Sequence, residues 1–229
     1  MRTQKDRRSE AEARLLATAR SLIARRGWAG TTLADVGVAA GYSRGLAAHY
    51  FGSKSGLLHE ITRQINNNFF DQVFQAPPCD PGLETLMSFV SVYLGRKDPD
   101  WTNTRALLLL MTEALLEDSG NAQQMTDYNR FVLAYLEEHV RLGIERGEID
   151  AGIEPRVSAE AVVGMLRGMM LQRLVQGSDP QAGEMREQLV ALLRRALGAR
   201  PAGAAPGGSR VKATTRAAAN EAANAKVLQ

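Results

Sequence analysis

The chain has 229 residues, 45% of them hydrophobic and 23% charged, with a formal net charge of +3 at pH 7, so it is long enough to bury a sizeable core. Its only cysteine, Cys79, excludes an intrachain disulfide and fits a reducing compartment. The longest apolar run near its middle, residues 106–111, is too short to cross a bilayer, and the charged N-terminal residues lack the apolar segment of a secretion signal, so we expect a cytoplasmic protein.

A first amphipathic helix is predicted from about Arg8 to Arg26, ending at Gly27. Its apolar positions recur at helical spacing and form one stripe, at Leu15, Ala19, Leu22 and Ile23. Four basic residues precede or open this helix: Arg2, Lys5, Arg7 and Arg8. They form a short arm that either contacts a phosphate or groove edge of DNA or is a frayed terminus.

A short second helix is predicted to begin after Thr32, whose hydroxyl caps the first backbone N–H groups while Asp35 returns the hydrogen bond. Thr31 is the alternative cap. The apolar side chains of this helix share one inward face, at Leu33, Val36 and Ala40. Gly41 follows where a left-handed turn favours a residue without a Cβ, and it ends the helix.

A third short helix is predicted to begin with Ser43 as its N-cap, with Leu46 and Tyr50 packed inward. Its outward face combines small residues with one long donor, which suits close approach to a DNA groove: Arg44, Gly45, Ala47 and Ala48. Two short helices joined at a glycine turn are typical of a helix-turn-helix that binds DNA.

The segments Gly41-Tyr42-Ser43-Arg44-Gly45 and His49-Tyr50-Phe51-Gly52-Ser53-Lys54 closely resemble the DNA-binding domain of TetR family transcriptional regulators, over about residues 10–60. The resemblance implies that the second short helix enters the major groove and that Lys54 contacts phosphate. Two positions depart from the family pattern. Ala48 replaces a tyrosine that contacts the DNA backbone, and Gly37 stands where alanine is common, at a loss of about 1 kcal/mol of helix propensity that packing must offset.

The motif and the resemblance together give the predicted DNA-binding residues, which are Thr31, Thr32, Tyr42, Ser43, Arg44, Gly45, Ala47, Ala48, His49, Tyr50, Ser53 and Lys54. The alternative is a small helical hairpin in an all-helical core, with Lys54 solvated and His49 a surface or packing residue. Charge favours DNA binding, because residues 1–60 hold 10 Lys and Arg against 5 Asp and Glu, whereas residues 61–196 hold 13 against 19. A solvated basic face would explain the same charge.

The remaining residues are predicted to be helical, because strand-like alternation bounded by hairpin turns is absent. The helix opened by Lys54 continues until the proline-rich break at residues 77–82. Further helices are predicted over residues 83–95, 102–117, 122–146, 155–176 and 180–197. The expected fold is all-α, with a three-helix bundle at 1–60, a helical effector-binding and dimerisation domain at 61–198, and a disordered, basic, Ala-rich tail at 199–229.

The later half of the chain is similar, more loosely, to the later half of TetR family proteins in the segments 143–149, 155 and 159–174. The resemblance implies that the last two long helices pair with those of a second subunit and that earlier helices enclose a ligand cavity. Gly164 and Gly168 would allow close approach of a partner helix, and the alternative is a buried helix in a monomer core. Because one recognition helix contacts few base pairs, we predict a homodimer on a palindromic operator.

Apolar and ionisable side chains of the later helices are the candidate effector-binding residues, because methionine and aromatic side chains line adaptable cavities that a few polar groups complete. The predicted set is Met87, Tyr93, Trp101, Arg105, Met111, Glu113, Tyr135, His139, Met165, Arg167 and Met169. The alternatives are core packing for the apolar members and an exposed or dimer-rim position for the ionisable ones.

Catalytic motifs are missing from the sequence. Its three histidines are scattered, and it has no zinc-protease helix, phosphate-binding glycine loop, dinucleotide fingerprint or nucleophile elbow. We therefore expect no enzyme activity, no metal and no cofactor. The predicted function is a sequence-specific transcriptional regulator, a repressor that a small-molecule effector releases from double-stranded DNA. The alternatives are a constitutive or activating DNA-binding protein and, in another class, a helical enzyme or adaptor.

Overall fold

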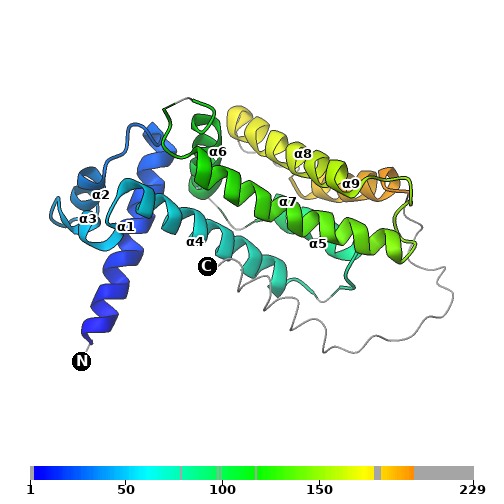
Figure 1. Ribbon diagram of the computed structural model, residues 1–229, viewed down its shortest axis with the longest axis horizontal. Coiled ribbons are helices and arrows are strands. Elements are labelled where there is room, and N and C mark those ends of the chain that lie inside the picture. Colours follow the sequence, from blue (N-terminus) through cyan, green and yellow to red (C-terminus); the bar gives the residue numbers. More distant parts are fainter. Residues whose placement is uncertain are drawn as a thin grey trace. The chain divides into compact units, whose positions relative to one another are not determined.

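The computed structural model describes residues 3–77, 79–96, 98, 100–116, 118–177 and 182–198. All regular secondary structure in these residues is helical, which confirms the expected all-α fold (Figure 1). The helices are α1 (Gln4–Arg26), α2 (Leu33–Ala39), α3 (Leu46–Phe51), α4 (Lys54–Gln75), α5 (Leu83–Leu94), α6 (Thr102–Glu113), α7 (Ala122–Glu145), α8 (Pro155–Gln176) and α9 (Ala182–Ala196).

The ends of α1 explain its length. The Thr3 hydroxyl accepts a hydrogen bond from the backbone N–H of Asp6 at 3.2 Å, and the Asp6 carboxylate accepts one from the N–H of Thr3 at 2.9 Å. This capping box was not predicted, and the predicted start of the helix at about Arg8 is too late. At the other end, Gly27 terminates the helix as predicted, with a φ of +77°.

Two other predicted boundaries differ from the structure or fall outside it. The helix predicted over 102–117 ends earlier, at Glu113, and residue 117 is not among the described residues. The described part of α9 begins at Ala182. The predicted start of this helix at residue 180 and the predicted tail at 199–229 lie outside the described residues.

The first hydrophobic core joins the N-terminal helices to α6. Leu15 and Ile23 of α1 and Leu58 of α4 are fully buried, and Leu110 of α6 is buried in the same cluster. α1 also packs extensively along α6. The core of the helix-turn-helix region is therefore continuous with a helix from the later half of the chain.

The second core lies among α4, α5, α7, α8 and α9. Its centre is aromatic: Phe69 and Phe70 of α4 meet Phe89 of α5, with the Phe69 and Phe89 ring centroids 5.1 Å apart and nearly perpendicular. α7 runs alongside α8 (Figure 1). Because α4 contributes to both cores, it connects the helix-turn-helix to the later helices.

No helix within the described residues combines the length and apolarity needed to cross a membrane. The same residues contain no group of three or more His, Cys, Asp or Glu side chains placed to hold a metal ion.

Candidate functional site

The start of α2 is fixed by a reciprocal cap. The Thr32 hydroxyl accepts from the backbone N–H of Asp35 at 3.1 Å, and the Asp35 carboxylate accepts from the Thr32 N–H at 3.3 Å. Arg26 adds an ion pair to the same carboxylate at 2.9 Å. Thr31, the alternative cap, is instead buried, and its hydroxyl donates to the Gly27 carbonyl at 2.8 Å. Thr32 is exposed, whereas the predicted DNA contact by Thr31 conflicts with its burial.

Gly37 allows α2 to approach the segment that leads into α3. A Cβ at this position would lie 2.5 Å from the carbonyl oxygen of Ser43, which is too close for any larger residue without a backbone shift. The backbone N–H of Tyr42 donates to the Gly37 carbonyl at 2.9 Å across the same turn. The glycine that departs from the family pattern thus has a packing reason that offsets its poor helix propensity.

The helix predicted to read DNA, α3, begins later than expected. Its N-cap is Gly45, no side chain caps it, and Ser43 contributes its carbonyl rather than its hydroxyl, accepting from the Leu46 N–H at 3.1 Å. The prediction of Ser43 as N-cap was therefore wrong. The prediction that Ala47 faces outward was also wrong, because Ala47 is fully buried in the first core.

The face that remains available to DNA is narrow and has no acidic residue. Its exposed members are Ser43, Arg44, Gly45, Ala48 and His49. The two tyrosines in the predicted set are half-buried and pack the segment down. Arg14 lies 5.6 Å from the ring centroid of Tyr42, and the Tyr50 hydroxyl donates to the Arg8 carbonyl at 3.3 Å.

Lys54, the first residue of α4, has its ammonium engaged within the protein. Nζ donates to the Trp28 carbonyl oxygen at 2.7 Å and lies 4.4 Å from the centroid of the indole ring. Burial lowers the pKa of Lys54, and the nearby Glu113 carboxylate acts in the opposite direction. Ser53, also in the predicted set, is exposed and caps α4 by accepting from the Gly56 N–H at 3.0 Å. A phosphate contact by Lys54 therefore requires Nζ to share or leave the Trp28 carbonyl.

Glu113 links the end of α6 to the turn before α2. Its carboxylate oxygens accept hydrogen bonds from the backbone N–H groups of Trp28 at 2.9 Å and Ala29 at 2.8 Å. Glu113 was predicted to bind the effector, but in the structure its carboxylate binds the turn between α1 and α2. This contact could not be predicted from local sequence, because 85 residues separate Glu113 from Trp28.

Most of the predicted effector-binding residues lie in the second core. Met87 and Tyr93 are buried there, and the Tyr135 ring packs edge-on against Phe70 with centroids 5.1 Å apart. Three further members are partly buried against the same core: Trp101, Met165 and Met169. These contacts are ordinary core packing, and an effector-binding role for them stays a prediction.

The other predicted members are dispersed. Arg105 is exposed on α6, and Met111 packs against the first core rather than the second. Arg167 donates to the Asn129 side chain at 2.6 Å, and His139 accepts through Nδ1 from a backbone N–H of the turn before α5 at 3.3 Å. The structure therefore does not bring the predicted polar groups together around one ligand.

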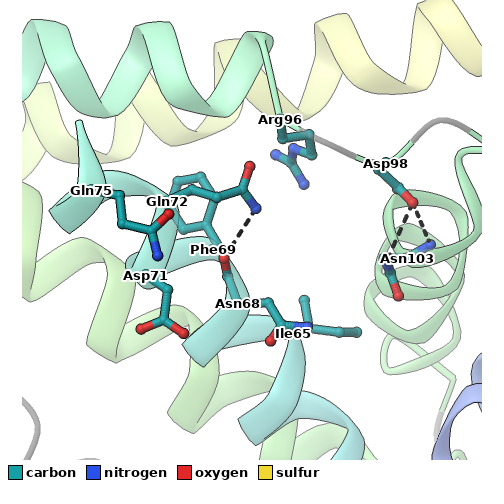
Figure 2. Close-up of a pocket in the computed structure, with 9 residues that line it drawn as sticks. All are labelled: Ile65, Asn68, Phe69, Asp71, Gln72, Gln75, Arg96, Asp98 and Asn103. Atoms are coloured by element: carbon teal, nitrogen blue, oxygen red, sulfur yellow. Dashed lines mark hydrogen bonds between the residues drawn. The ribbon is translucent and has the colours of Figure 1, made fainter.

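A cleft of about 300 Å³ lies between α4, the segment that follows α5 and the start of α6 (Figure 2). Its lining includes Ile65, Phe69, Gln72, Arg96, Asp98 and Asn103. None of the predicted effector-binding residues lines it. The cleft was not predicted because its walls come from three separate segments: α4, the non-helical residues Arg96 and Asp98 after α5, and the first turn of α6.

Two family models match the chain. Residues 15–61 match the model described as bacterial regulatory proteins, tetR family. Residues 82–198 match the model described as BetI-type transcriptional repressor, C-terminal, and this match alone covers more than half of the 229 residues. The first match contains α2 and α3, and the second contains every helix from α5 to α9.

Comparisons with individual proteins agree with the family models. The chain is 26% identical over 201 residues to the HTH-type transcriptional regulator CymR of Pseudomonas putida, covering 84% of this chain and 94% of CymR. It resembles the structure of FadR from Bacillus subtilis in complex with stearoyl-CoA, with a TM-score of 0.69, 16% identity and coverage of 79% and 96%. It also resembles AibR in complex with isovaleryl coenzyme A and operator DNA, with a TM-score of 0.61, 19% identity and coverage of 80% and 97%. At these identities the two structures show a shared fold.

Proposed function

Because the chain belongs to the tetR family of bacterial regulatory proteins, we propose that this DNA-binding transcriptional regulator is a repressor that binds a palindromic operator as a homodimer and is released by a small-molecule effector. The observation that carries the proposal is the exposed face around the start of α3. Arg44, Ala48 and His49 are exposed there, while the buried Ala47 fixes the opposite side of the helix in the core. The reading surface is thus held on a rigid support.

The chemistry of this face suits base readout in the major groove. The small side chains of Gly45 and Ala48 let the backbone approach, and a methyl group such as that of Ala48 suits contact with a thymine methyl. Arg44 supplies the fork of donors that pairs with guanine, and the His49 ring supplies a further donor. Ser53 is exposed beside this face, and its hydroxyl suits a contact to phosphate, whereas the Thr32 hydroxyl already donates to the Asp35 carboxylate at 2.7 Å.

A homodimer is supported by an uncovered stripe on α8. Residues that recur every three or four positions are at least partly exposed: Val157, Ala161, Gly164, Gly168, Leu171 and Val175. Val157 and Val175 are 63% and 79% exposed, which is unusual for valine in a folded helix. A Cβ at Gly164 or Gly168 would meet nothing within 4 Å, so the stripe has room for a second helix at short range. We propose that α8 of a second subunit occupies it.

Two observations support release by an effector. Proteins of similar fold are described with bound ligands, and α4 and α6 connect the later helices to the DNA-binding region. FadR and AibR, which share this fold, are each described in complex with an acyl coenzyme A, and AibR also with operator DNA. In this chain α4 begins beside the recognition helix and α6 ends on the Trp28 turn. A ligand that favours the DNA-incompetent arrangement of these helices would lower operator affinity, whereas equal affinity for both arrangements would shift nothing.

The test is fluorescence anisotropy of the full-length protein on labelled DNA flanking its own coding sequence, at several salt concentrations, with scrambled DNA as competitor. We expect tight binding that scrambled DNA does not compete away. Light scattering, measured in parallel, should give the mass of a dimer. Binding that scrambled DNA competes away equally, or full affinity from a monomer, would contradict the proposal. A promoter reporter separates repression from activation: removal of the protein should raise transcription for a repressor and lower it for an activator.

The proposal includes no catalytic step. It also places the protein in the cytoplasm, because a bacterial operator is read where the chromosome lies.

A further inference from the structure

The cleft between α4 and the start of α6 contains one basic side chain among its lining residues, Arg96. The guanidinium group is held in place by three contacts. It lies 3.7 Å from the ring centroid of Tyr93 and 5.6 Å from that of Phe69, and its Nε donates to the Tyr93 carbonyl oxygen at 3.0 Å. A guanidinium group stacked in this way presents its remaining donors in a fixed direction.

One of those donors lacks an acceptor. The Nη2 atom of Arg96 is buried and makes no hydrogen bond. The Asp98 carboxylate, which also lines the cleft, is already occupied: it accepts from the backbone N–H and the hydroxyl of Thr104 at 2.7 Å each, and from the backbone and side-chain nitrogens of Asn103 at 3.2 Å. A buried cationic donor without an acceptor is destabilising, so the site favours an oxygen ligand from outside the chain.

We propose that this cleft binds a small monocarboxylate, whose carboxylate pairs with Arg96 and whose apolar body lies against Phe69 and Ile65. This inference rests on the proposed function, in which the ligand is the effector. A planar carboxylate matches the guanidinium fork, and the volume of about 300 Å³ suits a small molecule. Asp71 lies on the far side of the cleft from Arg96 (Figure 2), and Asp98 keeps its charge because its hydrogen-bond donors are neutral. With two carboxylates against one arginine in the lining, a single negative charge fits better than a dianion.

The walls of the cleft belong to the helices that reach the DNA-binding region. Ile65 and Phe69 lie on α4, whose first residue is Lys54. Asn103 lies on α6, whose last residue, Glu113, binds the Trp28 turn. A carboxylate held between Arg96 and these walls would change the relative position of α4 and α6, which is where an effector must act.

The test is isothermal titration calorimetry of the full-length protein with two carboxylates. Hexanoate is compared with the neutral hexanamide, and benzoate with the neutral benzamide. Arg96→Gln removes the charge, and Arg130→Gln, at an exposed arginine of α7 outside the cleft, is the matched control. We expect at least one carboxylate to bind the wild type and the Arg130→Gln variant equally, and to bind Arg96→Gln about tenfold or more weakly. The amides should bind about tenfold more weakly than the acids.

Equal binding of acid and amide, equal binding to Arg96→Gln, or binding of neither carboxylate would overturn the proposal. Thermal melting and operator binding of Arg96→Gln check that the variant is folded. Arg96→Lys, which keeps the charge but loses the planar fork, should bind the acids with intermediate affinity. Operator binding without ligand is measured separately, so a failure of the DNA-binding proposal is distinguished from a failure of the carboxylate site.

Discussion

The carboxylate of Glu113, at the end of α6, accepts a hydrogen bond of 2.9 Å from the backbone N–H of Trp28, in the turn between α1 and α2. The carbonyl of the same Trp28 accepts the ammonium of Lys54 at 2.7 Å. One residue of the DNA-binding region is therefore held from both sides, by the last residue of α6 and the first residue of α4. Any movement of α6 relative to α4 changes this junction.

Glu113→Gln should destabilise the protein and weaken operator binding. A charged acceptor of two backbone N–H groups is replaced by a neutral one, and we expect the free energy of unfolding to fall by about 1–3 kcal/mol. Urea denaturation and anisotropy on operator DNA measure the two effects. Glu138→Gln, at an exposed glutamate of α7, should leave both unchanged. Unchanged operator affinity in Glu113→Gln would show that the junction does not support the DNA-bound form.

Gly27→Ala should be more disruptive than its size suggests. Gly27 has a φ of +77°, and a Cβ there would collide with the Glu113 carboxylate. The substitution therefore adds backbone strain to the loss of the Glu113 contact, and we expect a greater loss of thermal stability than in Glu113→Gln. Gly45→Ala is the control, because a Cβ at Gly45 would meet nothing within 4 Å.

Lys54→Met should weaken binding to every DNA sequence by a similar factor. The substitution keeps the apolar length that packs on Trp28 and removes the charge, so the slope of log affinity against log salt concentration should fall by about one. Anisotropy titrations on operator and scrambled DNA measure it. An unchanged slope would show that Nζ stays on the Trp28 carbonyl in the complex.

Arg44→Ala should reduce discrimination between operator and scrambled DNA. Arg44 is the long donor on the exposed reading face, and loss of one base contact costs about 1–3 kcal/mol of binding free energy. Competition anisotropy on operators with single base changes identifies the position at which preference is lost. If affinity for all sequences fell equally, Arg44 would be a phosphate contact instead.

Gly164→Glu should produce a folded monomer. Glutamate is a better helix former than glycine at an exposed position, so α8 itself should not be weakened, while a charged side chain would block a partner helix at this stripe. Light scattering measures the mass of the particle, and circular dichroism measures the helix content. Ala122→Glu, at the exposed first residue of α7, adds the same charge where a helix N-terminus favours it and should remain a dimer.

The stability of the protein should fall with acid because of His139. Burial, followed by the influence of Arg146, lowers the pKa of His139 from 6.5 to about 4, and the neutral ring accepts the Gly82 N–H. Between these pH values the unfolded chain binds a proton that the folded protein does not. The stability that the neutral His139 ring contributes is therefore fully present above pH 6.5 and is lost as the pH falls toward 4, by at most about 1.4 kcal/mol per pH unit.

His139→Gln should remove this pH dependence, measured as the free energy of unfolding at a series of pH values between 4 and 7. His59→Gln, which replaces an exposed histidine of α4, should keep the wild-type slope. A wild-type slope in His139→Gln would assign the acid sensitivity to other groups.

Local patterns in the sequence were sufficient for the presence of most helices and for the cap that begins α2. The cap formed by Thr32 and Asp35 depends on hydrogen bonds within a few residues, and the terminating glycines Gly27 and Gly41 depend on local backbone angles. Both features can therefore be predicted from the spacing of residues in the sequence. The resemblance to the family located the reading helix for the same reason, since its motif is short and contiguous.

The facing of single residues on the shortest helix was harder to predict. α3 has six residues, too few for periodicity to separate the buried Ala47 from the exposed Ala48. Its N-cap is Gly45 rather than Ser43, and the Ser43 carbonyl lies close to Gly37 of α2, a contact that spacing within α3 does not reveal.

Tertiary structure alone decided what the polar groups of the later helices do. Glu113 and Arg105 are both ionisable residues among the apolar residues of α6. In the structure, Glu113 binds the Trp28 turn, whereas Arg105 is exposed. The stacked Arg96, with its unpaired Nη2, depends on Phe69 of a different helix. The sequence determined the helical fold and several helix ends, because those follow from interactions between near neighbours, and its contiguous motif indicated the family. The packing of distant segments determined the junction and the cleft, because a hydrogen bond across 85 residues leaves no local pattern.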